Sequence, residues 1–310
     1  MAKAAEDYGF HAFWVWDVSL YAKDAYIALT LAAVNTEKII LGPGVSNPLT
    51  RHLSITANAI ATLDDLSEGR AVLGFGRGAP GSANAVGFPT PRIEIFRENL
   101  VRLSALVRGE VLVLDEGVRY RVQSVQRPIP LYLAVWGPRM IQLAGELTDG
   151  ALIAGPTQKE LMGGKMRQVL EAAKAAGRDP RQVEVNLQLT LSTHPDPQMA
   201  IDDLRPLIAY QIRRGPLSWE DELPPEHADE VRRIRRQFAY GDSPTSRGTR
   251  MGLVSDALVK YVGIVGTEDE CRERLADIFT LRPDSVTFRL AAGDRMQRLK
   301  RLAALVSKVS

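Results

Sequence analysis

The sequence lacks the features that mark several special classes of protein. Cys271 is the only cysteine among 310 residues, which excludes a disulfide framework and a cysteine-based metal site. No apolar run reaches the ~18–20 residues of a membrane-spanning helix, and no apolar stretch near the N-terminus resembles a signal peptide. The four histidines are scattered without the spacing of a metal site. We therefore expect neither a membrane partner nor a metal, and a reducing cytoplasm suits the single thiol.

A strong excess of either charge is also missing, because the net charge is +2 with the histidines neutral. The densest basic run covers residues 232–236, and Glu226, Asp229 and Glu230 stand beside it. This mixture predicts a solvated helix face, and we expect no nucleic acid as a partner. The composition, with 45% apolar and 25% charged residues, is that of an ordinary globular protein.

Segments of strand and helix character alternate along most of the chain, which predicts parallel strands joined by crossover helices. The predicted strands cover residues 10–16, 38–41, 71–75, 130–135, 151–154, 183–191 and 285–290. The predicted helices cover residues 24–34, 53–66, 93–107, 140–147, 160–176 and 296–309. Asp24 is a candidate N-cap, Gly177 is a C-cap signal, and residues 111–122 predict a hairpin.

The alternation and the length of 310 residues together fit an α/β fold of the TIM (β/α)8 barrel type. We can place seven barrel strands, because the chain begins inside a predicted helix at residues 2–8. The barrel is therefore expected to lack its first strand in this sequence, or to be open there. Residues 1–310 are treated as a single domain with an irregular segment within 192–283. Its polar loop at 241–248 is either a mobile lid or an ordinary surface connection.

One glycine-rich segment matches a nucleotide-binding pattern. Gly76, Gly78 and Gly81 form G-x-G-x-x-G directly after a predicted strand, which is the fingerprint of a Rossmann dinucleotide site. The context argues against that site, because Pro80 interrupts the pattern and no helix follows promptly to bind a pyrophosphate. A barrel loop whose glycines let a flat ring approach the backbone fits the sequence better.

Two further segments combine the end of a strand with an unusual backbone. Residues 136–140 (Trp-Gly-Pro-Arg-Met) end a strand and begin a helix, whose unpaired N–H groups and dipole attract an anion such as phosphate. A plain turn with a surface arginine explains the same residues without a ligand. Residues 41–48 (Leu-Gly-Pro-Gly-Val-Ser-Asn-Pro) lie at a strand's carboxyl end, where TIM barrels carry their active sites. A tight turn alone also requires such residues.

Four segments, taken in order, resemble the luciferase-like monooxygenase superfamily. They resemble its second strand (residues 9–17), its third strand and bulge (40–52), its third helix and fourth strand (61–78), and its cofactor-phosphate segment (137–150). Within the superfamily the sequence is most similar to the coenzyme F420-dependent branch, to which the methylenetetrahydromethanopterin reductases belong. The resemblance is clear over residues 1–155.

The resemblance implies a TIM barrel that binds coenzyme F420 or, as the alternative, FMN. It implies a non-prolyl cis peptide at Gly44–Val45 that backs the cofactor ring, and Asn47 as a hydrogen-bond partner of the ring edge. Arg77 and Gly78 correspond to the loop that lies near the ring.

The same resemblance assigns Gly137, Arg139 and Met140 to the segment that holds the cofactor phosphate. It also implies a homodimer or a homotetramer as the assembled form.

The sequence departs from the resemblance at two proton-handling positions. Val18 stands where relatives often have histidine, and Ala79 stands where they often have an acidic residue. Neither side chain can carry a proton. The proton would then come from the substrate, from water or from Asp17, which is the candidate catalytic residue; Tyr21 and the 241–248 loop are weaker candidates.

The function predicted from the residues and the resemblance is hydride transfer between coenzyme F420 and an unidentified small organic substrate. The cofactor would carry the redox chemistry and the protein would supply its position. An FMN-dependent monooxygenase is the first alternative, and a cofactor-binding but inactive or truncated family member is the second. An NAD-dependent Rossmann dehydrogenase is the least favoured.

Overall fold

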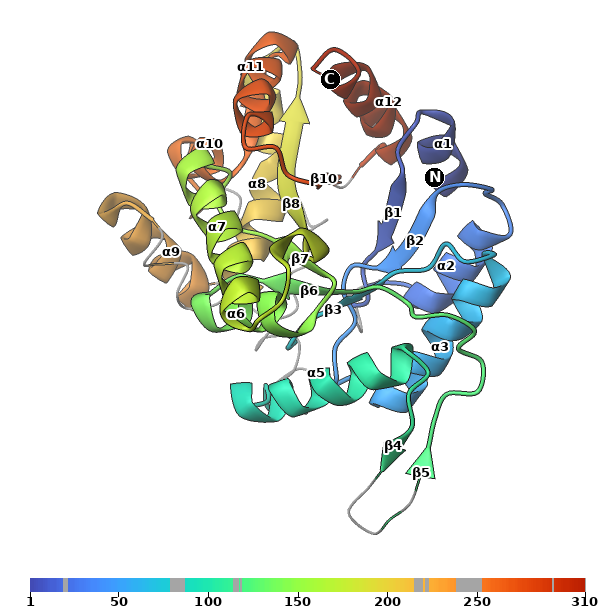
Figure 1. Ribbon diagram of the computed structural model, residues 1–310. Coiled ribbons are helices and arrows are strands. Elements are labelled where there is room, and N and C mark those ends of the chain that lie inside the picture. Colours follow the sequence, from blue (N-terminus) through green and yellow to red (C-terminus); the bar gives the residue numbers. More distant parts are fainter. Residues whose placement is uncertain are drawn as a thin grey trace. The chain divides into compact units, whose positions relative to one another are not determined.

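The computed structural model describes residues 1–18, 22–78, 87–113, 117, 119–214, 220, 223–237, 253–291 and 293–309. The chain divides into two compact units. Unit 1 consists of residues 1–135, 139–152 and 169–183, and unit 2 consists of residues 136–138, 153–168 and 184–310. Figure 1 shows the helices and strands of both units.

The strands of unit 1 run in parallel. β1 (Ala12–Val15) pairs with β2 (Ile40–Pro43) in the register Ala12↔Ile40 to Val15↔Pro43. Parallel bridges at Leu41↔Ala71 and Ser46↔Phe75 connect β2 to β3 (Leu73–Phe75), and β3 pairs in parallel with β6 (Leu131–Val135). β7 (Gly150–Ile153) follows β6 in the sheet. The carboxyl ends of β1, β2, β3 and β6 therefore lie along one edge.

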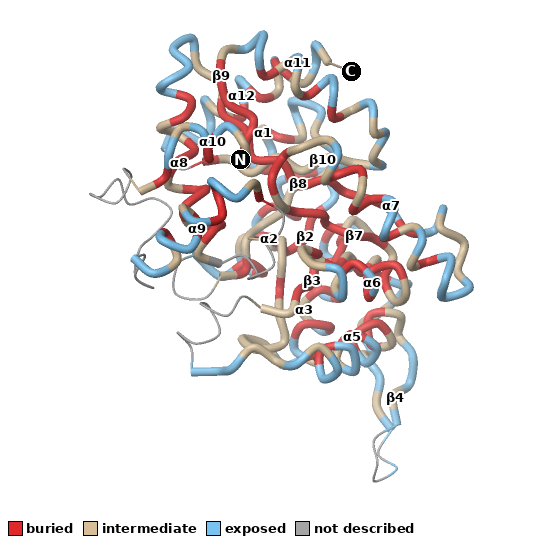
Figure 2. Tube along the Cα trace, turned by 90° about the vertical axis from the view of Figure 1, so that its left-hand side faces the viewer, coloured by how far each residue is buried: buried red, intermediate tan, exposed pale blue. Residues whose placement is uncertain are grey.

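Helices precede, separate and follow these strands along the chain, and each contributes buried apolar residues. They are α1 (Ala2–Asp7), α2 (Ala25–Ala33), α3 (Leu53–Leu66), α5 (Ile93–Val107), α6 (Pro138–Leu147) and α7 (Lys159–Ala175). The predicted cap at Asp24 is confirmed, since its carboxylate accepts hydrogen bonds from the N–H groups of Tyr26 and Ile27. The Phe75 and Phe96 rings stack 5.9 Å apart between β3 and α5. The chain is buried over β3 and β7 (red in Figure 2).

The predicted hairpin is also present in unit 1. β4 (Leu112–Val113) and β5 (Arg119–Tyr120) pair in antiparallel register, with Leu112 opposite Tyr120. Gly117 between them has φ +77°, a left-handed conformation that glycine adopts without strain.

Unit 2 is built around one long strand, β8 (Glu184–Thr193). β10 (Ser285–Arg289) pairs with it in parallel from Ser285↔Asn186 to Arg289↔Thr190. β9 (Ile264–Gly266) pairs in parallel with the last residues of β8. The helices of this unit are α8 (Pro197–Arg214), α9 (Pro225–Gln237), α10 (Asp256–Val262), α11 (Glu268–Phe279) and α12 (Arg295–Val306).

Unit 2 is more regular than the sequence predicts. The described part of residues 192–283 is mostly helical and contains β9, which the sequence analysis missed. β9 has three residues and follows α10 almost directly, so its apolar pattern is too short to separate it from the helix. The loop at 241–248 lies outside the described residues. None of the described helices combines the length and apolar composition that a membrane crossing needs.

The basic helix α9 differs in one detail from its prediction as a solvated face. Arg232, Arg233 and Arg236 are exposed, but the Arg235 side chain is only 12% exposed. Arg235 donates hydrogen bonds to the carbonyl of Ile212 and to a Glu220 carboxylate oxygen. Arg235 therefore connects α9 to Ile212 and Glu220, because its aliphatic stem is packed while its charged group is paired.

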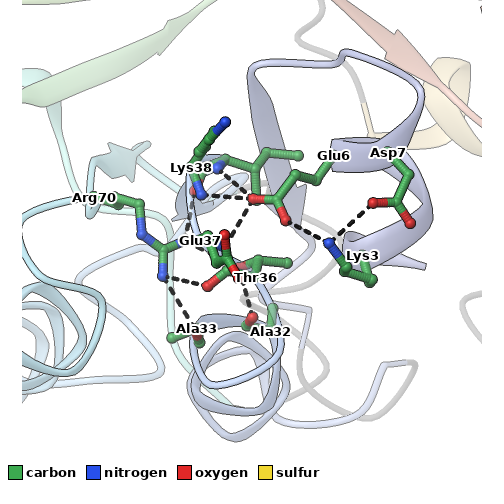
Figure 3. A network of polar contacts seen from close by, with 10 residues as sticks. Lys3, Glu6, Asp7, Ala32, Ala33, Thr36, Glu37, Lys38 and Arg70 are labelled. Atoms are coloured by element: carbon green, nitrogen blue, oxygen red, sulfur yellow. Dashed lines mark hydrogen bonds and ion pairs between the residues drawn. The ribbon is translucent and has the colours of Figure 1, made fainter.

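The loop before β2 is held by two charged side chains (Figure 3). One oxygen of Glu6 accepts hydrogen bonds from the N–H groups of residues 37–39, at 2.9, 2.6 and 2.9 Å. The Arg70 guanidinium donates to the carbonyls of Ala33, Thr36 and Ile39. These N–H groups lower the pKa of Glu6 to about 2, with the Lys38 N–H as the largest cause. The contacts fasten the amino end of β2, opposite to the edge where the strands end.

Candidate active site

Segments that follow β1, β2 and β3 come together at one edge of unit 1. Asp17 stands two residues after β1, Gly44 directly follows β2, and Arg77 stands two residues after β3. Because these strands are parallel neighbours, their carboxyl ends are adjacent. The structure therefore brings together most of the residues that the sequence analysis names for the ring of a cofactor.

The peptide bond between Gly44 and Val45 is cis, which confirms the conformation implied by the resemblance. Backbone hydrogen bonds tie this bulge to both neighbouring strands. The Gly44 N–H donates to the Val15 carbonyl at 2.7 Å, and the Ser46 N–H donates to the Gly74 carbonyl at 2.9 Å. The Gly76 N–H in turn donates to the Ser46 carbonyl at 2.9 Å. The bulge is therefore part of the sheet.

The glycines around the bulge are explained by close packing within unit 1. A Cβ atom at Gly42 would lie 2.3 Å from the Val72 carbonyl oxygen, and one at Gly74 would lie 2.2 Å from the Pro43 carbonyl oxygen. A Cβ atom at Gly44 would lie 3.0 Å from the Cβ of Trp14. These positions exclude a side chain because backbone and indole already occupy the space, so the glycines alone do not indicate a ligand.

Trp14 on β1 and Tyr132 on β6 bring two aromatic rings into contact. Their ring centroids are 6.1 Å apart, with a tilt of 41°. A Cβ atom at Gly150 would lie 2.8 Å from the Tyr132 ring, so β7 approaches this ring closely. Trp14 Nε1 is buried and has no acceptor among the described residues. Buried donors in proteins are normally hydrogen-bonded, so this N–H group is an unsatisfied donor among the described residues.

Asp17 belongs to a network of polar side chains that includes Ser46, directly after the bulge. It is 8% exposed, and its Oδ2 accepts a hydrogen bond from Ser46 Oγ at 2.6 Å and from Arg51 Nε at 3.3 Å. Tyr26 Oη lies 3.1 Å from Ser46 Oγ. Because the Ser46 hydroxyl donates its hydrogen bond to Asp17, the tyrosine hydroxyl is the donor in the Tyr26–Ser46 hydrogen bond. Arg51 also pairs with Asp24 and lies over the Tyr26 ring. The network fixes the carboxylate as a hydrogen-bond acceptor.

Burial raises the pKa of the Tyr26 hydroxyl above its usual range, and the nearby Asp17 charge adds to the increase, although the Ser46 hydrogen bond opposes it. Tyr26 is therefore a neutral donor in this network at physiological pH. Neither Tyr26, Ser46 nor Arg51 was named from the sequence. The network that they form with Asp17 has no local signal, because α2 and the bulge bring these residues together only by packing.

The two polar atoms of the Asn47 side chain differ in their hydrogen bonds. Its side-chain oxygen accepts hydrogen bonds from the N–H groups of Leu49 and Thr50, at 3.0 and 3.2 Å, which closes a turn after the bulge. The amide nitrogen is therefore the end that can donate to a ligand. A Cβ atom at Gly78, whose φ is +86°, would lie 3.7 Å from this oxygen and 2.7 Å from Leu49 Cδ1.

The two arginines named from the sequence are accessible. Arg139 is exposed and Arg77 is partly exposed, and neither forms an ion pair with any carboxylate of the described residues. Arg139 and Met140 stand in the first turn of α6, which begins at Pro138, as its N1 preference predicts. Gly137 belongs to unit 2, and Ala79 and Tyr21 lie outside the described residues.

No group of three or more His, Cys, Asp or Glu side chains in the described ranges is arranged to hold a metal ion. The buried Cys271 lies in α11, and burial raises the pKa of its thiol to about 11. A thiol with this pKa carries little thiolate at neutral pH.

A family model named luciferase-like monooxygenase matches residues 1–285, which is most of the chain. The chain belongs to this family. Its parallel strands and covering helices show the α/β fold of the luciferase-like barrel enzymes. A solved structure of coenzyme F420-dependent tetrahydromethanopterin reductase from Methanopyrus kandleri matches with a TM-score of 0.80 and 25% identity, over 99% of this chain and 94% of that chain.

Curated members of the family are similar over most of their length. A 5,10-methylenetetrahydromethanopterin reductase of Methanolobus tindarius is 31% identical over 288 residues, which is 90% of this chain and 86% of the relative. An F420-dependent glucose-6-phosphate dehydrogenase of Kineococcus radiotolerans is 31% identical over 222 residues, which is 66% of each chain. Relatives at this level of identity therefore act on different substrates.

Proposed function

We propose that this chain is an oxidoreductase that transfers a hydride between coenzyme F420 and an organic substrate. One observation carries the proposal: the Gly44–Val45 bulge, Asn47 and the Arg77–Gly78 turn meet at the carboxyl ends of adjacent parallel strands. Relatives that are named for dependence on F420 support the choice of cofactor.

The residues present fit such a cofactor. The bulge is partly exposed, the Asn47 amide nitrogen is the end that can donate, and Trp14 Nε1 is a buried donor with no acceptor in the described part of the chain. Arg139 is an exposed cation at a helix start, where N–H groups and the dipole favour an anion. When bound, the deazaflavin supplies the hydride donor or acceptor.

The chain itself would position the cofactor and control protons. Residues 44–45 would support the ring, Asn47 would donate to its edge, and Arg139 with the N–H of Met140 would bind the phosphate. Asp17 stays the candidate proton-handling group, as an acceptor, because Ser46 and Arg51 both donate to it. Val18, three residues after β1, offers no proton.

Two further expectations remain proposals. A cytoplasmic location is a prediction from the sequence. Self-association into a dimer or tetramer has one structural support: Ile27, Leu31 and Val34 form an exposed apolar stripe along α2, at 67, 61 and 64% exposure. We propose a second copy of the chain as its partner, which light scattering of the purified protein tests.

The cofactor proposal is tested by titrating the purified protein with F420 and FMN in parallel. We expect F420 to bind and Arg139→Ala to weaken it by about 1–3 kcal/mol, which is roughly 5- to 150-fold in Kd, because a charge-assisted hydrogen bond is lost. Arg301→Ala is the matched control, since Arg301 is an exposed arginine on α12. Binding of FMN alone would instead support the monooxygenase alternative, and equal F420 affinity in both variants would contradict the phosphate assignment.

A further inference from the structure

Arg289, the last residue of β10, is held by two other segments of unit 2. Its Nη2 donates a hydrogen bond to Gln188 Oε1 on the paired strand β8. Its guanidinium carbon lies 6.0 Å from the ring centroid of Trp136, the residue that directly follows β6. An arginine stacked on an aromatic ring and fixed by an amide oxygen has few orientations available, so its remaining N–H groups have a defined direction.

This guanidinium has no anionic neighbour in the described part of the chain, since no ion pair joins it to any carboxylate there. Other partly buried arginines are paired: Arg205 with Asp202 and Asp256, and Arg298 with Asp203. Arg274 has no described ion pair but donates to three backbone carbonyl groups. Arg289 differs from these because Gln188 is its one acceptor among the described residues.

A cation in this position is costly without a counter-charge. Burial lowers the pKa of the Arg289 guanidinium to about 10, although the nearby Tyr210 hydroxyl opposes the decrease. The residue as a whole is nevertheless of intermediate exposure. It also stands at the carboxyl end of its strand, the end at which barrel enzymes place functional groups.

We propose that Arg289 is a specificity-determining residue that binds an anionic oxygen group of the substrate, a carboxylate or a phosphate. Of its five N–H donors, one is given to Gln188, and a planar guanidinium can offer two of the others to one anion in bidentate fashion. Trp136 and Gln188 are the positioning residues that hold it in place.

The assignment to substrate rests on the proposed function, in which Arg139 binds the phosphate of the cofactor. Arg289 is then a second cation for a second anion. It contacts Trp136, and Trp136 precedes the proposed phosphate segment by one residue in the chain. The proposal therefore limits the unidentified substrates to organic acids and phosphate esters.

The test measures anion binding and F420 binding separately, on the full chain. Inorganic phosphate and succinate are titrated at constant ionic strength, with intrinsic tryptophan fluorescence and the unfolding temperature as readouts. The variants are Arg289→Gln, Arg289→Lys and the control Arg301→Gln. We expect at least one probe to bind the wild type and the control, with a tenfold or greater loss in Arg289→Gln and a smaller loss in Arg289→Lys, which keeps the charge but not the planar fork.

Stability distinguishes a binding role from a structural one. Without anion, Arg289→Gln is expected to unfold at the same temperature as the wild type or higher, because a desolvated charge with no described carboxylate beside it is removed. A lower unfolding temperature together with unchanged anion affinity would make Arg289 a structural residue and overturn the proposal. Absence of anion binding by the wild type would overturn it as well.

F420 binding separates the two proposals. Unchanged F420 affinity in Arg289→Gln supports the assignment to substrate, whereas a parallel loss of F420 and anion binding would assign Arg289 to the cofactor and overturn it. If the wild type binds anions through Arg289 but does not bind F420, the proposed function fails while the anion site remains.

Discussion

Gly74 offers a sharp test of the packing around the candidate site. A Cβ atom there would lie 2.2 Å from the backbone oxygen of Pro43, where real Cβ atoms essentially never come closer than 3.0 Å. It would also lie 3.0 Å from Val45 Cγ1 and 3.2 Å from Trp14 Cζ3. Gly74→Ala therefore forces β2 and β3 apart by the difference between 3.0 and 2.2 Å, which is 0.8 Å.

The expected loss of stability follows from two effects. Overpacking of a closely packed core costs about 1–3 kcal/mol. The hydrogen bond from the Ser46 N–H to the Gly74 carbonyl is strained by the same movement, which adds about 0.5–1.5 kcal/mol. We expect Gly74→Ala to lower the free energy of unfolding by about 2–4 kcal/mol, or the unfolding temperature by roughly 4–16 °C. F420 affinity should fall too, because Val45 is displaced.

Two glycines of α7 are matched controls. A Cβ atom at Gly164 would meet nothing within 4 Å, so Gly164→Ala should stabilise the protein by about 0.5–1 kcal/mol, the helix preference for alanine. At Gly163 a Cβ atom would lie 2.9 Å from Leu281 Cδ2, a flexible side-chain end. Gly163→Ala should therefore fall between the other two. Urea and thermal unfolding followed by circular dichroism measure the series, and a Gly74→Ala protein as stable as the wild type would refute the reasoning.

Two further predictions concern charged groups of unit 1. The pKa of Glu6 is lowered to about 2 from 4.5, so its contribution to stability is complete above pH 4.5 and is lost as the pH falls toward 2. Glu6→Gln should lower the unfolding temperature at pH 7. Between pH 5 and pH 3 the unfolding temperature of this variant should fall less than that of the wild type. Equal pH profiles of the two proteins would contradict this. Asp17→Asn keeps an acceptor for Ser46 but removes the charge that faces Arg51, and it should cost about 1–3 kcal/mol in urea unfolding. Unchanged stability would show that this buried pair contributes little.

Part of the candidate site was predictable because its signals are local. The cis conformation at Gly44–Val45 lies in the 40–52 segment from which it was expected, and the start of α6 is marked by Pro138. The partners of Asp17 were not predictable, since Ser46 and Arg51 are 29 and 34 residues away along the chain. Arg289 carries no motif either. Its significance lies in the absence of a described carboxylate neighbour, which is visible only once β8, β10 and Trp136 are assembled.

The sequence by itself determined the order and type of most elements, because periodicity, caps and turn residues act over a few positions. The helices at 53–66 and 93–107 begin and end as predicted, and Asp24 caps α2. Only the tertiary structure decided the three-residue strand β9, which exists through its pairing with β8. It also decided why Gly42 and Gly74 must be glycine, because the atoms that exclude a side chain come from neighbouring strands. Steric exclusion and charge pairing depend on residues that meet only after folding.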